Sequence, residues 1–338
     1  MHQRTGYALT ISELKDVVDN RLPSQLFSPS NLPRETPFTW QKQFISGESL
    51  EPIATLASNL FNRWIAASAL LILVALDAAV IKQWINQPTH TPSSPTGLAT
   101  SIALVLVGVL VHELGHVSAL QKFGRRSGGI GFGIYWIFPT FYADVSSTWR
   151  LRKRQRAIVD VGGLYLQSIY AIAVCIWALL SEQPETAYVV LWTTHFMMLY
   201  TLNPTLKFDG YWLLSDITGV SNLHSKILSS ARACVERVRG ETARLHLQRH
   251  QIWTLIVFSL TSLLYFSYLF ISLTMSLKHA IHQLTNDHNS WWATAGTIAL
   301  TLFLSFIFLM LARKCLGAIS AVLAQADPDD MTNREETS

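Results

Sequence analysis

Three polar residues near the end of a long apolar stretch have the spacing of a metal site. His112 and His116 are four residues apart, which on a helix places them about 40° apart around the axis and one turn apart along it. Both imidazoles can therefore reach one metal ion. Glu113 lies about 100° from His112 around such a helix, where it can take a proton from a water molecule at the metal. This is the HExxH arrangement of zinc-dependent peptide hydrolysis.

A catalytic zinc ion needs a third protein ligand, with the fourth position left for water. The best candidate is Asp209, in the segment NPTLKFDG. The apolar run before it stops at Asn203-Pro204, and Gly210 permits a tight turn that can aim a carboxylate back into a helix bundle. The sequence therefore predicts one zinc ion per chain, in which Asp209 joins the two histidines and Glu113 is the general base.

The setting of the HExxH residues favours a functional interpretation. Two histidines and a glutamate inside an apolar run are costly to place in hydrocarbon, so ionisable groups at such positions indicate a functional site by default. The alternative is that these groups pair with one another, or with the backbone, in the interior of a bundle.

The elements that must position these residues are long apolar runs. The chain of 338 residues is 50% hydrophobic and only 14% charged, which is too apolar for a soluble protein unless the apolar residues are segregated. Six runs are long enough to cross a hydrocarbon core of about 30 Å, which needs roughly 20 helical residues. They are 62–84, 98–121, 157–181, 187–203, 251–276 and 292–312. We expect an all-α multispanning membrane protein with about six transmembrane helices.

The segment 127–142, SGGIGFGIYWIFPTFY, follows the HExxH residues and is too interrupted by Gly and Pro to be a clean span. We expect a re-entrant or β-hairpin loop beside the metal, because irregular backbone at membrane depth is tolerated only where protein covers it or where it lines a wet cavity. An exposed strand edge there would accept an extended substrate by β-addition. A packed interfacial loop is the alternative.

Basic residues indicate the orientation, because loops rich in Lys and Arg stay on the cytoplasmic side. With the N-terminus inside, the inside segments carry five, eight, seven and three Lys or Arg residues, in 1–61, 122–156, 204–250 and 313–338. The outer side carries only Lys82 and Lys278. Both termini are therefore expected in the cytoplasm, with no signal peptide before the first span. We assign the net charge of +4 to contact with anionic lipid, and expect no nucleic-acid partner.

Three domains are expected, namely a cytoplasmic N-terminal segment, a six-helix domain and a cytoplasmic tail, at 1–61, 62–312 and 313–338. The N-terminal segment holds a Pro-rich linker up to Pro37 and, over 49–64, either an interfacial helix or a plain extension of the first span. The core motifs fall within 98–220, and 204–250 forms a cytoplasmic loop.

These motifs together resemble the site-2 protease family of intramembrane zinc metalloproteases, which join an HExGH helix to a distant Asn/Pro-containing DG motif. The corresponding segments here are HELGH and NPTLKFDG. The chain is most similar to a bacterial branch of peptide zinc metalloproteases, at FGIYWIFPTFYADVSSTWRL, VGGLYLQ and LNPTLKFDGYWLLSDITGV. The resemblance covers roughly 50–225 and implies that His112, His116 and Asp209 bind zinc while Glu113 acts as general base.

The resemblance also implies the cellular role. We expect an integral protein of a bacterial inner membrane that cleaves a membrane-associated protein or a ribosomally made peptide near the cytoplasmic face. Its partners would be membrane lipid, that substrate, and proteins of peptide export or maturation. The chain departs from the family in that Asn203 directly precedes Pro204 and Phe208 stands where the family has Leu. No segment between the spans has room for an inserted PDZ domain.

Further residues are candidates for a supporting role. Family members place an Asn near the substrate, so Asn203 is a candidate for substrate positioning. Gly162 and Gly163 are included with it, although close helix packing explains them equally well. Gln167, on the same run, is a candidate polar contact.

Asp144 and His195 have several interpretations each. Asp144 can cap a helix, pair with Arg150 or Arg152, or lie near the metal and the substrate. His195 is either a histidine hydrogen-bonded inside the bundle or a group behind the metal ligands.

Two functions of other classes stay open. A non-catalytic scaffold, peptide-binding or export component would keep the protease fold, but it has no use for a general base such as Glu113. A di-iron membrane desaturase would use the HxxxH spacing of His112 and His116, which His246 and His250 repeat. Such enzymes need further histidines in HxxHH boxes, and the sequence has no such box.

Overall fold

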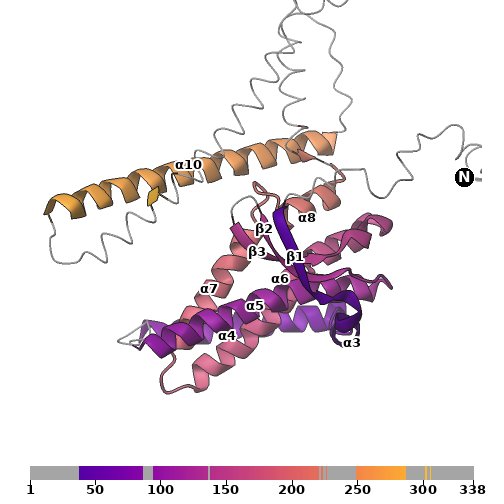
Figure 1. Ribbon diagram of the computed structural model, residues 1–338, viewed down its shortest axis with the longest axis horizontal. Coiled ribbons are helices and arrows are strands. Elements are labelled where there is room, and N and C mark those ends of the chain that lie inside the picture. Colours follow the sequence, from indigo (N-terminus) through magenta and orange to yellow (C-terminus); the bar gives the residue numbers. More distant parts are fainter. Residues whose placement is uncertain are drawn as a thin grey trace, which may run out of the picture. The chain divides into compact units, whose positions relative to one another are not determined.

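The computed structural model describes residues 38–86, 94–135, 138–220 and 249–286, together with single residues at 222, 223, 226, 301, 302 and 305. Its elements in chain order (Figure 1) are β1 (Phe38–Ser46), α3 (Gly47–Ser58), α4 (Arg63–Ile85), α5 (Pro95–Lys122), β2 (Gly129–Tyr135), β3 (Phe138–Asp144), the 3-10 helix η3 (Ser146–Arg150), α6 (Lys153–Leu180), α7 (Glu185–Thr201), α8 (Asp209–Thr218) and α10 (Arg249–Asn286).

Four helices are long and apolar enough to cross a membrane, and they coincide with four of the six predicted spans. They are Arg63–Ile85, Pro95–Lys122, Lys153–Leu180 and Gln251–Met275. The run at 187–203 is helical as α7, but its 17 residues extend only about 25 Å, less than the roughly 30 Å of a hydrocarbon core. The run at 292–312 lies outside the described residues except at 301, 302 and 305.

The described part of the chain is mostly helical, as expected, but it is not purely α-helical, because three strands form a sheet in the order β1-β2-β3. The hairpin expected in 127–142 is confirmed as β2 and β3. Strand β1 was not expected, although its sequence FTWQKQFIS places Phe38, Trp40 and Phe44 at alternating positions, the period-2 pattern of a strand. We ended the Pro-rich linker at Pro37 and expected no strand in the residues that follow it.

The chain divides into two compact units, each described by itself. The smaller comprises Met1–Lys42 and Phe132–Thr140, and its described part is a patch of paired strands. There Phe38 packs edge-on against Tyr135 at a centroid distance of 5.7 Å, and the hydroxyl of Thr39 donates to the carbonyl of Ile134 at 3.1 Å. Cross-strand aromatic pairs of this kind stabilise a sheet locally.

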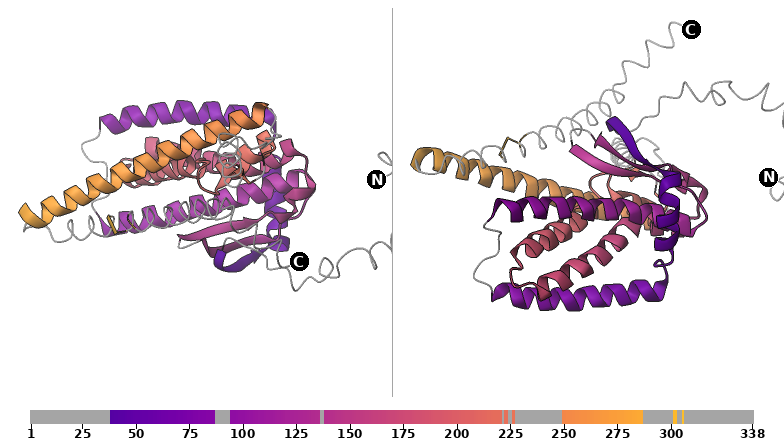
Figure 2. Two further views of the ribbon diagram at one scale, coloured as in Figure 1. Left: turned by 90° about the horizontal axis from the view of Figure 1, so that it is seen from above. Right: turned by 60° about the horizontal axis from the view of Figure 1, so that its bottom comes forward.

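The larger unit comprises Gln43–Gly131 and Phe141–Ser338, and α6 lies at its centre. This helix packs against α4, α5, α7 and α8, and Figure 2 shows it between α4 and α5. The buried side chains at this interface are mainly aliphatic or small, and they include Leu73, Val80, Ala171, Val174 and Ala178.

Helix starts in the larger unit are fixed by polar caps. Asn62 accepts a hydrogen bond from the N–H of Trp64 at 2.9 Å, and Ser94 accepts from the N–H of Gly97 at 3.1 Å. Such caps contribute about 1 kcal/mol each. Because α3 ends at Ser58 and α4 begins after the Asn62 cap, the stretch predicted at 49–64 is a helix separate from the first span.

Two glycines bring α5 and α6 into backbone contact. A Cβ added to Gly162 would lie 2.7 Å from the carbonyl oxygen of Gly115, and a Cβ added to Gly115 would overlap the carbonyl of Gly162. Small residues at facing positions permit this approach in membrane helices. The close contact lies directly beside the HExxH residues, so it sets how near α6 comes to them.

Candidate metal centre

Three ligand atoms converge at the junction of α5 and α8. The Nε2 atom of His112 lies 2.9 Å from Oδ2 of Asp209 and 3.2 Å from Nε2 of His116. Nε2 of His116 lies 3.5 Å from the same oxygen of Asp209. Both histidines are buried. Within the part of the chain that the structure describes, these three residues form the one group of side chains able to hold a metal ion.

Asp209 reaches the histidines because it is the first residue of α8. The turn between α7 and α8 is closed by Asn203, whose Oδ1 accepts the N–H of Thr205 at 2.9 Å. Gly210 packs against the backbone of Leu202 so tightly that a Cβ would overlap its carbonyl group. The tight turn predicted at Gly210 is therefore a close approach between the start of α8 and the end of α7.

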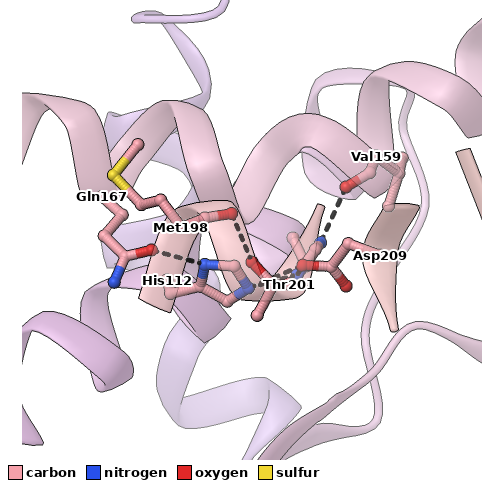
Figure 3. Close-up of polar contacts among 7 residues, drawn as sticks. His112, Val159, Gln167, Met198, Thr201 and Asp209 are labelled. Atoms are coloured by element: carbon pink, nitrogen blue, oxygen red, sulfur yellow. Dashed lines mark hydrogen bonds and ion pairs between the residues drawn. The ribbon is translucent and has the colours of Figure 1, made fainter. Parts of the chain in front are cut away.

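The two imidazoles are oriented by hydrogen bonds from their far nitrogens (Figure 3). Nδ1 of His112 lies 3.0 Å from Oε1 of Gln167, and Nδ1 of His116 lies 2.8 Å from the carbonyl oxygen of Val159. A carbonyl oxygen only accepts, so Nδ1 of His116 carries a proton, and the neutral form of this ring has a lone pair on Nε2 that can bind a metal. Metal-binding histidines are held in this way by oxygen acceptors.

The donor set and the space between its atoms fit zinc. Ligands about 2.1 Å from a tetrahedral zinc ion lie about 3.4 Å from one another, close to the separations of the three atoms here. On the α6 side, a Cβ on Gly163 would lie 2.5 Å from Nε2 of His116 and 2.6 Å from Nε2 of His112. Any side chain larger than hydrogen at position 163 would collide with both imidazoles and with an ion bound to their Nε2 atoms.

Charge at the site favours an ionised ligand. Burial raises the pKa of the Asp209 carboxyl, but the adjacent imidazoles of His116 and His112 outweigh burial and hold this pKa well below its ordinary value. Asp209 lies in α8, outside the four candidate spans. A carboxylate that stays ionised is the form that binds a metal cation.

Glu113 lies beside the three ligand residues. Its carboxyl lies near His112, His116 and Asp209 and accepts a hydrogen bond from the backbone of Ala143 in β3. Glu113 lies on a different side of α5 from the two histidines. Its carboxyl is therefore next to the three candidate ligands, on the side of the β2–β3 hairpin.

The structure gives local partners to other predicted site residues. Oδ1 of Asp144 accepts the N–H and the hydroxyl of Ser146, at 3.1 and 2.5 Å, and the N-cap residue of η3 is Val145. Gly162 packs against α5, and Asn203 closes the turn before α8. A role toward substrate stays a prediction for Asp144, Asn203, Gly162 and Gly163.

His195 takes part in a separate polar contact between α4 and α7. Its Nε2 lies 3.1 Å from Oδ2 of Asp77, and its Nδ1 lies 2.9 Å from the carbonyl oxygen of Leu191. The thiol of Cys175 donates to the other oxygen of Asp77 at 3.4 Å. His195 is therefore a hydrogen-bonded histidine of the bundle, as the first of its two interpretations states.

Sequence reasoning singled out neither Val159 nor Asp77, and it gave Gln167 no link to the metal. The signal for Gln167 was its position four residues after Gly163, which places both on one face of α6. Backbone carbonyls such as that of Val159 leave no such signal. The side chains of His246, His250 and His279 lie outside those described.

Comparison with known proteins gives one distant relationship. Over 113 residues the chain is 28% identical to the protein named "Putative peptide zinc metalloprotease protein YydH" of Bacillus subtilis (strain 168). The matched part covers 32% of this chain and 44% of that protein, so the chain spans less than half the length of this relative. No family model and no solved structure matches the chain. The match shows a distant, partial relationship to a protein named as a zinc metalloprotease.

Proposed function

We propose that this chain is a membrane zinc metallopeptidase of the site-2 protease kind. It would cleave a membrane-associated protein or a ribosomally made peptide near the cytoplasmic face of a bacterial inner membrane, with both termini in the cytoplasm. The observation that carries the proposal is the convergence of His112, His116 and Asp209, with Glu113 beside them, in a unit built from helices apolar enough to span a membrane. The name of the distant relative supports the same chemistry.

The proposed chemistry assigns each residue a task. Two imidazoles and the Asp209 carboxylate would hold the ion, and one carboxylate leaves it a net positive charge. Zinc bound there would supply a Lewis acid that polarises the scissile carbonyl and lowers the pKa of a water molecule toward about 7. Glu113 would take the proton of the attacking water and pass it to the leaving amine.

The hairpin offers a way to present the substrate. Among the described strands, β3 is paired on one side only, and the backbone of its residue Ala143 hydrogen-bonds the Glu113 carboxyl. An extended peptide that added to β3 as a further strand would gain main-chain hydrogen bonds. Its backbone would then pass close to the general base.

Substitution of Glu113 tests the proposal. Mass spectrometry of candidate precursor peptides from cells that carry wild-type or Glu113→Gln protein should show a fall in processing of about 10²- to 10⁴-fold, the range for loss of a general base. Glu51→Gln is the matched control, because Glu51 lies away from the candidate metal centre and pairs with the exposed Arg126. Chelation should abolish processing and added zinc restore it.

The same experiment separates a protease from a scaffold. Glu113→Gln leaves the three ligands in place, so the variant should still bind zinc. If it processes the precursor at the wild-type rate, the proposed function is wrong, whatever its zinc content.

A further inference from the structure

An ion pair joins the far end of α8 to the start of α6. Nε of Arg156 donates to Oδ1 of Asp216 at 2.8 Å, and Nη2 of Arg156 lies 2.7 Å from the same oxygen. Nη1 of Arg156 donates to the carbonyl of Leu151 at 3.2 Å. Both side chains are mostly buried, with 27% of Arg156 and 18% of Asp216 exposed. Two hydrogen bonds and one ion-pair contact therefore fix the guanidinium.

Asp216 shares a face of α8 with the metal ligand Asp209. The two residues are seven positions apart in a helix of ten residues, so they lie two turns apart and about 20° from alignment around the axis. One face of this short helix thus carries the carboxylate that meets the histidines and the carboxylate that meets Arg156.

The first turns of α6 contact both histidines of the candidate centre. The carbonyl of Val159, three residues after Arg156, accepts the hydrogen bond of His116. Gly163, one turn further on, lies against both imidazoles. Arg156 therefore ties the helix that carries Asp209 to the segment of α6 that orients the other ligands.

Asp216 also hydrogen-bonds the side chain of Asp160 in α6, whereas Gly210, Tyr211 and Leu214 hold α8 by packing. Near its start, Gly210 packs against Leu202. Along its length, Tyr211 and Leu214 pack with Leu255 and Phe258 of α10. Apolar packing of this kind does not fix rotation as hydrogen-bonded ions do. Without the polar contacts of Asp216, α8 could turn about its first residues and carry Asp209 away from the histidines.

We propose that Arg156 and Asp216 are positioning residues that hold Asp209 in place for the metal. The inference rests on the proposed metal site and adds two residues that act on the metal through Asp209. Loss of groups that orient metal ligands typically lowers metal affinity about 10- to 100-fold, and this range is the expected effect of Asp216→Asn.

The test is a zinc titration of the purified full-length chain in detergent, in competition with a chromogenic chelator. Asp216→Asn keeps the shape of the side chain and removes its charge, so it should weaken zinc binding about 10- to 100-fold. Arg156→Lys keeps the charge but not the forked geometry and should also weaken it. Arg126→Lys is the matched control, because Arg126 is largely exposed and pairs with Glu51; its affinity should equal that of the wild type.

A double-mutant cycle distinguishes positioning from general loss of structure. In the Asp209→Ala background, Asp216→Asn should lower zinc affinity no further, because the ligand that it positions is gone. An equal loss in both backgrounds would overturn the positioning role, as would an unchanged affinity of Asp216→Asn in the wild-type background. A wild-type chain that binds no zinc would instead overturn the metal site itself, and this inference with it.

Discussion

Gly163 of α6 faces His116 of α5 so closely that a methyl group on the glycine would lie 2.5 Å from Nε2 of the histidine. The space that this glycine leaves open is the space between the ligand atoms. Gly163→Ala should therefore abolish zinc binding while the helical content of the chain is preserved. Zinc content by atomic absorption and far-ultraviolet circular dichroism of the detergent-purified variant measure the two quantities.

The control for this prediction is Gly108→Ala in α5. A Cβ there would lie 3.0 Å from the side chain of Tyr170, a neighbour that can move by a few tenths of an ångström. This variant should retain zinc. If Gly163→Ala binds zinc as tightly as Gly108→Ala does, the ion is not held between α5 and α6.

Gln167 should tune metal affinity through His112. The hydrogen bond from Nδ1 of His112 to Oε1 of Gln167 keeps Nε2 directed at the metal, so Gln167→Ala should weaken zinc binding about 10- to 100-fold. Gln167→Glu keeps an acceptor at this position and should recover most of the affinity. Chelator competition measures both variants.

Ser168→Ala is the matched control for Gln167. Ser168 is equally buried, but its hydroxyl donates to the carbonyl of Tyr165 in its own helix. Its removal should leave zinc affinity unchanged. If Gln167→Ala and Ser168→Ala lose the same amount of zinc affinity, helix packing sets that affinity and the orientation of His112 does not.

Zinc should stabilise the folded chain. A ligand that binds only the folded state adds about 2.7 kcal/mol at a free concentration 100 times its dissociation constant. Chelation should therefore lower the unfolding temperature of the wild-type chain, and added zinc should restore it. Asp209→Asn lacks an anionic ligand, so its unfolding temperature should respond little to either treatment. A wild-type chain that is insensitive to chelation would contradict the metal site.

The sequence indicated the candidate ligand residues more completely than it indicated the strands of the fold. The spacing of His112 and His116 fixes their relation on any helix, and the break at Pro204 with Gly210 indicates where Asp209 turns back. The polar groups that hold these ligands were harder to find. The acceptor for His116 is a backbone carbonyl, and the partner of Arg156 is 60 residues away, so neither follows from local spacing.

The sheet shows where sequence patterns failed. Strand β1 has nine residues that alternate aromatic and polar side chains, but this local pattern is less prominent than the long apolar runs that follow it. It is stabilised by strand partners about 90 residues later, as the bond from Thr39 to Ile134 illustrates. Pairing over such a separation depends on tertiary context that local propensity does not contain.

The pair Asp77 and His195 should stabilise the contact between α4 and α7. The two side chains lie 3.1 Å apart and are mostly buried, in helices with few other polar groups. Polar contacts between membrane helices contribute about 0.6 kcal/mol on average and up to about 1.7 kcal/mol. A double-mutant cycle with Asp77→Asn and His195→Phe should give a coupling within this range in the free energy of unfolding, measured by denaturant titration in mixed micelles.

Zinc affinity provides the internal control for this pair. Both nitrogens of His195 are engaged away from the metal ligands, by Asp77 and by Leu191, so His195→Phe should lower stability and leave zinc affinity at the wild-type value. The double variant should lose less stability than the sum of the losses in the two single variants. Each single variant leaves the other polar group without this partner in an apolar interface. A loss of zinc affinity in His195→Phe would instead place this histidine among the groups that support the metal ligands.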